Sequence, residues 1–150
     1  MKKLNTVTIR VFSYESEDAE AVKKGLASFI SLDLEKEKIA VEKSVSKGDE
    51  GEEDITIFQL MLVKEKHTNA FLRFIGEKIS QKDKETILKQ AETRLDEELN
   101  FFIRFNKDKI LNEQKYELAY DGNCYHIRMN IAAFPHKRET ALETVREIFK

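Results

Sequence analysis

Three segments of the chain alternate between apolar residues and residues that are mostly polar, and this alternation constrains the fold more than any other feature. The segments are Thr6–Val11, Phe101–Asn106 and Tyr125–Ile131. Successive side chains of a β-strand point to opposite faces of a sheet, so each segment has one apolar and one polar face. The sequence therefore predicts a sheet with one face packed against a core and the other open.

The parity of the residue number assigns each side chain to a face. The residues predicted to face the core are Val7, Ile9, Val11, Phe101, Ile103, Phe105, Tyr125, Ile127, Met129 and Ile131. Those predicted to point the other way are Thr8, Arg10, Phe12, Phe102, Arg104, Asn106, His126, Arg128 and Asn130.

Apolar residues at helical spacing predict four helices among these strands. They cover residues 19–30, 71–79, 87–95 and 141–149, and further strands are expected at 39–45, 55–63 and 115–119. We expect Ser16 to cap the first helix and Pro135 to be the first residue of the last. The order β-α-β-β-α-α-β-β-β-α lacks regular βαβ alternation. We therefore predict a single α+β domain over residues 1–150, with a mixed, mostly antiparallel sheet and helices packed on one face.

The segment Ile55–Val63 differs from the other strands because it is apolar on both faces. Such a strand is expected to be covered on both sides, either by helices or by a partner subunit. The preceding stretch, residues 47–54, is acidic and contains glycine, which is typical of an exposed hairpin loop.

Bulk composition restricts the class of protein. The chain has 26 basic and 28 acidic residues, and the high charged content of 36% suits a thermophile. Cys124 is the only cysteine, so no intramolecular disulfide forms, and a reducing, cytoplasmic location is expected. No apolar run reaches the roughly 18 residues of a membrane span, and the N-terminus has no apolar signal region.

Candidate catalytic and metal-binding groups lack the expected spacing. The histidines His67, His126 and His136 belong to no metal-ligand motif. The carboxylates of Asp96-Glu97-Glu98 fall at a helix-to-strand junction, where polar residues are expected without any catalytic role. No partner for a nucleophilic Cys124 is indicated by the sequence. We therefore expect no enzyme, no metal and no cofactor.

The outward face of the predicted strands carries arginine together with aromatic residues. Arg10 neighbours Phe12, Phe102 neighbours Arg104, and His126 neighbours Arg128. Between Phe101 and Arg138 there are seven basic and four acidic residues, although the whole chain is net negative. Arginine and exposed aromatic rings on a sheet neutralise phosphates and stack on unpaired bases. The pattern favours RNA binding, although solvation alone also places polar residues on an open face.

Two segments of the C-terminal half resemble a known family. They are Thr93–Lys107, which reads TRLDEELNFFIRFNK, and His126–Arg138, which reads HIRMNIAAFPHKR. They resemble a small archaeal family of predicted RNA-binding proteins, linked by gene neighbourhood to the exosome, whose fold is similar to ribosomal protein L-five. The resemblance implies RNA and exosome or ribosome-related proteins as partners. The chain departs from the family at residues 48–54, where an acidic tip replaces a histidine-bearing turn.

These observations predict a noncatalytic RNA-binding or ribonucleoprotein-associated module. The alternative is a protein–protein interaction or homodimerisation module that pairs through residues 55–63 and binds no nucleic acid. The residues expected to contact RNA are Arg10, Phe102, Arg104, Lys107, His126, Arg128, Lys137 and Arg138.

Overall fold

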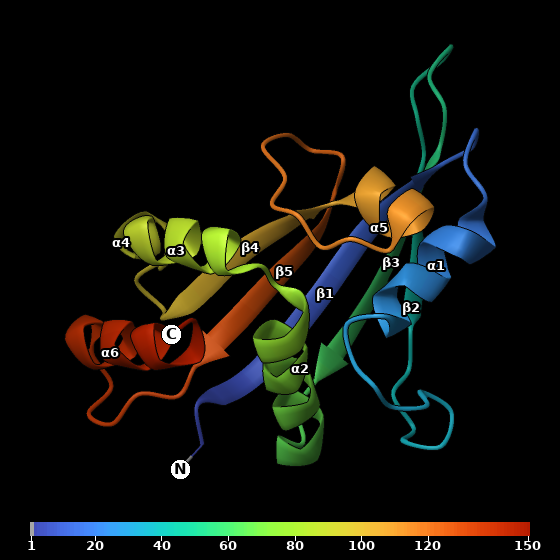
Figure 1. Ribbon diagram of the computed structural model, residues 1–150. Coiled ribbons are helices and arrows are strands. Elements are labelled where there is room, and N and C mark those ends of the chain that lie inside the picture. Colours follow the sequence, from blue (N-terminus) through green and yellow to red (C-terminus); the bar gives the residue numbers. More distant parts are fainter. Residues whose placement is uncertain (1) are drawn as a thin grey trace.

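The computed structural model describes residues 2–150 and is built around a five-stranded sheet (Figure 1). The strands are β1 (Leu4–Tyr14), β2 (Glu42–Ser46), β3 (Ile55–Leu62), β4 (Asn100–Asn106) and β5 (Cys124–Ile131). They lie in the order β2-β3-β1-β5-β4, and every neighbouring pair is antiparallel. The longest strand, β1, is central between β3 and β5, and β4 is the edge strand beyond β5.

The helices lie on one side of this sheet, as predicted (Figure 1). They are α1 (Ala19–Ala27), α2 (Glu65–Lys78), α3 (Gln81–Lys89), α4 (Ala91–Arg94), α5 (Lys107–Glu113) and α6 (Arg138–Ile148). No helix within residues 2–150 has the length and apolar character that crossing a bilayer requires. The fold is thus α+β, with one helix layer and one uncovered sheet face.

The strand register confirms the assignment of side chains to faces. Ile9 pairs with Ile127, and Ile127 pairs with Ile103, and all three side chains are fully buried under the helices. One residue further along, Arg10 pairs with His126, which pairs with Arg104. Directly paired residues lie on the same face of a sheet. This second row therefore belongs to the uncovered side, which we call the open face.

Helix α1 is attached to the sheet by a contact that requires glycine. The Tyr125 hydroxyl donates a 2.6 Å hydrogen bond to the Val22 carbonyl. A Cβ atom added at Gly25 would lie 2.0 Å from that hydroxyl oxygen. The glycine therefore costs helix propensity but admits the tyrosine. The helix is capped by Asp18, whose carboxylate accepts from the Glu20 and Ala21 amides, and not by Ser16.

Several predicted boundaries were wrong. The expected strand at 115–119 is reduced to one bridge between Phe105 and Leu118, because a new helix, α5, follows β4 directly. Asn106 starts that helix by accepting from the Lys109 amide. The last helix begins at Arg138, so Pro135 lies in the preceding turn.

Strand β3 is packed on one side only. Phe58, Leu60 and Leu62 are buried beneath the helices, but Met61 is 46% exposed on the open face. Of the two kinds of cover expected for this strand, helices of the same chain supply only one side, and cover of the other side by a partner subunit stays a prediction. Its apolar outer face is left to solvent or to a partner.

Candidate nucleic-acid interface

Strands β1, β5 and β4 bring three arginines together around His126 on the open face. Arg10 and Arg104 flank His126 in one row across the sheet. In the next row Arg128 pairs with Thr8 on one side and Phe102 on the other. Neighbouring strands are about 4.8 Å apart, so the backbones of Arg10 and Arg104 are about 10 Å apart. Long side chains from these positions can reach successive groups of an extended ligand.

The three guanidinium groups of Arg10, Arg104 and Arg128 have no carboxylate partner. Within residues 2–150, none of them takes part in an ion pair of 4 Å or less. Arg10 instead donates from Nε to Gln59 Oε1 at 3.1 Å. The described outward residues of β1, β5 and β4 include no acid, and the nearest acidic position in the row is Glu42 on the edge strand. The positive charge of the open face is therefore available to an anion.

His126 lies at the centre of this positive cluster. Its half-buried position, followed by the neighbouring Arg104, Arg10 and Arg128, lowers the pKa of the imidazole below its usual 6.5. The ring is therefore neutral at pH 7. Its centroid is 5.7 Å from that of Phe102, with 37° between the planes. Together the two rings form a small aromatic surface between the arginines.

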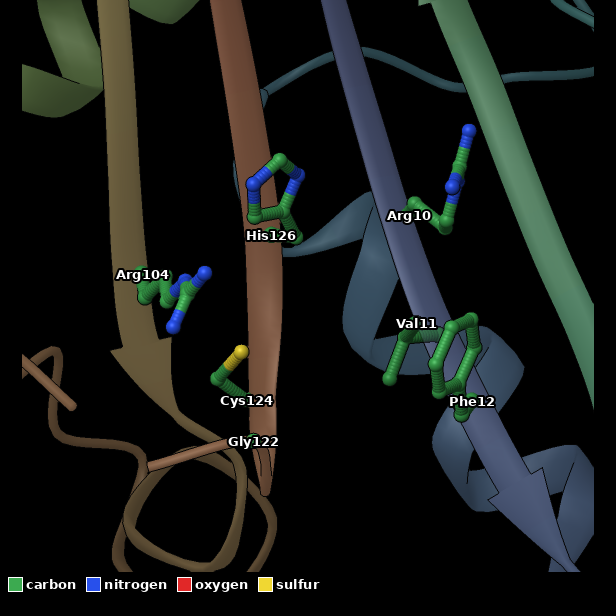
Figure 2. A pocket seen from close by; sticks show the side chains of 7 residues that line it. All are labelled: Arg10, Val11, Phe12, Arg104, Gly122, Cys124 and His126. Atoms are coloured by element: carbon green, nitrogen blue, oxygen red, sulfur yellow. The ribbon is translucent and has the colours of Figure 1, made fainter. Parts of the chain in front are cut away.

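A shallow pocket of about 240 Å³ opens beside this row. Its lining residues are Arg10, Val11, Phe12, Arg104, Gly122, Cys124 and His126. Figure 2 shows Phe12 on β1 and Cys124 on β5 on opposite sides of the hollow. It also shows Arg104 reaching from β4 towards β5, whereas Arg10 points away towards β3. Burial raises the pKa of the Cys124 thiol, so this group stays protonated and is a poor nucleophile.

Lys107 does not belong to the interface, which corrects the expectation from the sequence. Its side chain is only 1% exposed. Nζ donates to the Glu17 carboxylate at 2.8 Å and to the Phe12 carbonyl at 2.9 Å, and it lies 5.2 Å from the centre of the Tyr14 ring. The lysine thus joins the start of α5 to the end of β1 and cannot reach a phosphate.

Lys137 and Arg138 also lie away from the open face. Arg138 begins α6 and donates to the backbone carbonyls of Leu95 and Glu92, at and beside α4 in the helix layer. Lys137 Nζ is 3.9 Å from the Glu139 carboxylate. The structure therefore gathers five of the eight expected residues on one surface, namely Arg10, Phe102, Arg104, His126 and Arg128.

Asp96, the first of the three acidic residues after α4, has a structural role. Asp96 accepts from the backbone amides of Glu98 and Asn100 at 3.0 and 2.8 Å, which holds the turn into β4. Residues 2–150 contain no group of three histidine, cysteine or acidic side chains suited to a metal.

The contact of Gln59 with Arg10 and the place of Gly122 and Cys124 in the pocket were not predicted from the sequence. Gln59 is the only polar residue between Ile57 and Val63, and a lone polar residue in an apolar strand was the available signal. Gly122 and Cys124 gave no signal, because their place in the pocket depends on the pairing of β5 with β1 and β4.

The fold and this surface define the chain as an α+β protein with an uncovered, arginine-bearing sheet. Residues 6–132 match the family described as RNA binding, and the chain belongs to that family. An RNA-binding protein of Pyrococcus abyssi is 28% identical over 144 residues, covering 95% of this chain and 92% of that protein.

Solved structures show the same fold. A protein of Archaeoglobus fulgidus superimposes with a TM-score of 0.83 at 23% identity, covering 97% of this chain and 99% of its own. A DUF54 protein of Methanothermobacter thermautotrophicus superimposes with a TM-score of 0.75 at 26% identity, covering 99% of both chains. These relatives are archaeal, and the likeness extends over the whole sheet and helix layer.

Proposed function

We propose that this protein binds RNA without catalysis, through the open face of its sheet. The observation that carries the proposal is the set of three guanidinium groups, Arg10, Arg104 and Arg128, which face solvent without a carboxylate partner. Phosphate binding requires a positive field at the contact surface, and the open face has one even though the chain is net negative. Membership of the RNA binding family supports this proposal.

The aromatic residues favour unpaired over duplex RNA. Phe12 is 38% exposed, and Phe102 forms the aromatic surface with His126. Within residues 2–150, the open face of the sheet carries no helix that could enter a groove, whereas exposed rings stack on splayed bases. We therefore propose single-stranded RNA, or the single-stranded part of a folded RNA, as the ligand.

The cellular setting extends this proposal. The resemblance to an exosome-linked family suggests a ribonucleoprotein assembly, with exosome or ribosome-related proteins as further partners in the cytoplasm. The archaeal relatives and the 36% charged composition are consistent with a thermophilic source. The likeness of the fold to ribosomal protein L-five stays a prediction.

The test is fluorescence anisotropy of a labelled single-stranded RNA at salt concentrations from about 50 to 300 mM. Each phosphate contact contributes about −0.7 to the slope of log affinity against log salt, so three contacts give about −2 and a loss of about fortyfold over this range. The Arg104→Ala/Arg128→Ala double variant should retain a slope of about −0.7. The matched control, Arg73→Ala/Arg146→Ala, removes the same charge from exposed positions in the helix layer. Absence of binding at the lowest salt would refute the proposal.

The exposed apolar residues of β3 favour a second candidate function, homodimerisation. Met61 is 46% exposed on the open face, and Val63, just beyond the strand, is 58% exposed. Burial of these side chains in a partner would be insensitive to salt, unlike phosphate contacts. Sedimentation analysis of the protein and of a Met61→Lys variant tests the homodimer. A dimer that pairs through β3 is dissociated by this change, whereas RNA binding by a monomer does not depend on Met61.

A further inference from the structure

The pocket beside His126 differs from a second hollow of the open face, next to Gln59, because Glu42 lines that hollow, whereas no carboxylate of the described part of the chain lines the pocket. The arginine row is suited to a sugar–phosphate backbone, which needs charge but no cavity. The pocket holds about 240 Å³ and is open to solvent between Phe12 and Cys124. That space is below the usual range for drug-sized ligands and fits one planar ring system. The hydrogen-bonding groups of the lining residues determine which ring system the pocket would bind.

The pocket walls offer hydrogen-bond donors and few acceptors. Arg10 and Arg104 carry only donors. Two backbone carbonyls at the pocket are already engaged, since Phe12 accepts from Lys107 Nζ at 2.9 Å and Gly122 accepts from the Cys124 amide at 3.0 Å. Besides the weakly accepting thiol, the neutral imidazole of His126 is the one lining side chain that provides an acceptor.

This donor excess discriminates among the four bases. Guanine presents two acceptors, O6 and N7, on one edge, and uracil presents the O4 carbonyl in the same place. Adenine and cytosine present an amino group there, which needs an acceptor. An arginine that approaches guanine in its plane makes two parallel bonds to O6 and N7. Arg104, which lines the pocket and points from β4 towards β5, is the residue placed to do this (Figure 2).

We infer that the pocket takes one unstacked keto base, guanine or uracil, which packs against Phe12 and is read by Arg104. This inference rests on the proposed RNA binding, in which Arg10 and Arg128 hold the flanking phosphates. Arg10 lines the pocket, but its guanidinium is turned towards β3, where Nε donates to Gln59 Oε1 at 3.1 Å, so Arg104 and not Arg10 is placed to read the base.

The experiment compares labelled oligocytidine RNAs that carry a single central guanosine, uridine, adenosine, cytidine or abasic residue. Affinities of the full-length protein are measured by anisotropy at one salt concentration. Guanosine or uridine should bind about tenfold more tightly than cytidine, and adenosine and the abasic residue should give no comparable gain. A further RNA with 7-deazaguanosine removes the N7 acceptor. A lower affinity for this RNA than for the guanosine RNA indicates that Arg104 bonds to both O6 and N7. An unchanged affinity, together with equally tight binding of the uridine RNA, indicates a bond to the carbonyl oxygen alone.

Two variants test the pocket through the ratio of guanosine to cytidine affinity measured on the same protein. Arg104→Lys keeps the charge but removes the planar fork, and Cys124→Leu fills the hollow. Each should reduce the ratio to about two or less. Thr93→Leu, at an exposed position of α4, is the matched control and should keep the wild-type ratio. Thermal unfolding of each variant verifies that the fold is intact.

The outcomes separate this inference from the function on which it rests. Equal, salt-dependent affinity for all five RNAs would overturn the base pocket and leave backbone binding by the open face in place. A preference for adenosine or cytidine would overturn the donor argument directly. No binding to any of the RNAs would overturn both the inference and the proposed function.

Discussion

Replacement of Lys107 by methionine tests whether this residue has a structural role or binds RNA. The change removes the charged group that bonds to Glu17 and to the Phe12 carbonyl, both at less than 3 Å. Removing one partner of a buried ion pair costs about 3 to 5 kcal/mol. The Glu17 side chain is 23% exposed and is partly hydrated after the change, so we expect the lower end, about 3 kcal/mol. For a chain of this length that corresponds to a decrease in Tm of about 6 to 12 °C.

The assay is thermal and urea unfolding of Lys107→Met beside Lys109→Met. Lys109 lies in the same helix and pairs with Glu113 at 3.0 Å, but both side chains are about 40% exposed. An exposed pair of this kind contributes less than about 1 kcal/mol. The salt slope of RNA binding should be the same in Lys107→Met and the wild type, because Nζ cannot reach a phosphate. Equal stability of the two variants, or a slope reduced by about 0.7, would refute the structural role.

Two further predictions concern Gly25 and His126. Gly25→Ala should destabilise the protein by about 2 kcal/mol in urea unfolding, because the new methyl group displaces the Tyr125 hydroxyl from Val22, and an unchanged or raised stability would contradict this. Bound phosphate favours the imidazolium form of His126, so RNA affinity should increase as the pH falls from about 7.5 to 5.5, and His126→Gln should remove this dependence. Without RNA, the lowered pKa of His126 has the opposite effect on the free energy of unfolding. The neutral imidazole stabilises the fold fully above pH 6.5, and this stabilisation decreases as the pH falls below 6.5, because the unfolded chain takes up the proton first.

The alternation of residues predicted the two faces of the sheet, and it placed five of the eight residues expected to contact RNA together on the open face. Arg104 and Arg128 were placed correctly because each is flanked by apolar residues that the core must bury. The same rule explains the error at Lys107. Its odd number continues the series Phe101, Ile103 and Phe105 into the packed layer, but it was assigned by charge instead of parity.

The remaining errors arose where the structure depends on contacts between distant segments. Arg138 is expected at the interface because it is basic, but the fold places it against Leu95, just after α4 and 43 residues earlier in the sequence. The pocket could not be predicted at all, since it forms where Phe12 and Cys124 are brought together by the pairing of β1 with β5. A local sequence pattern does not predict a contact between segments so far apart in the chain.

The division of β5 between two faces has a consequence for how proteins of this family diverge. Its odd residues, such as Ile127 and Met129, are fully buried, so substitutions there are limited by packing. His126 and Arg128 point to the opposite face of the sheet from the helix layer, so we expect their replacement to leave the packing of the helices unchanged. Selection can therefore alter the ligand preference of this surface at little cost in folding. Relatives that share the fold at 20–28% identity are free to have acquired different targets on the same scaffold.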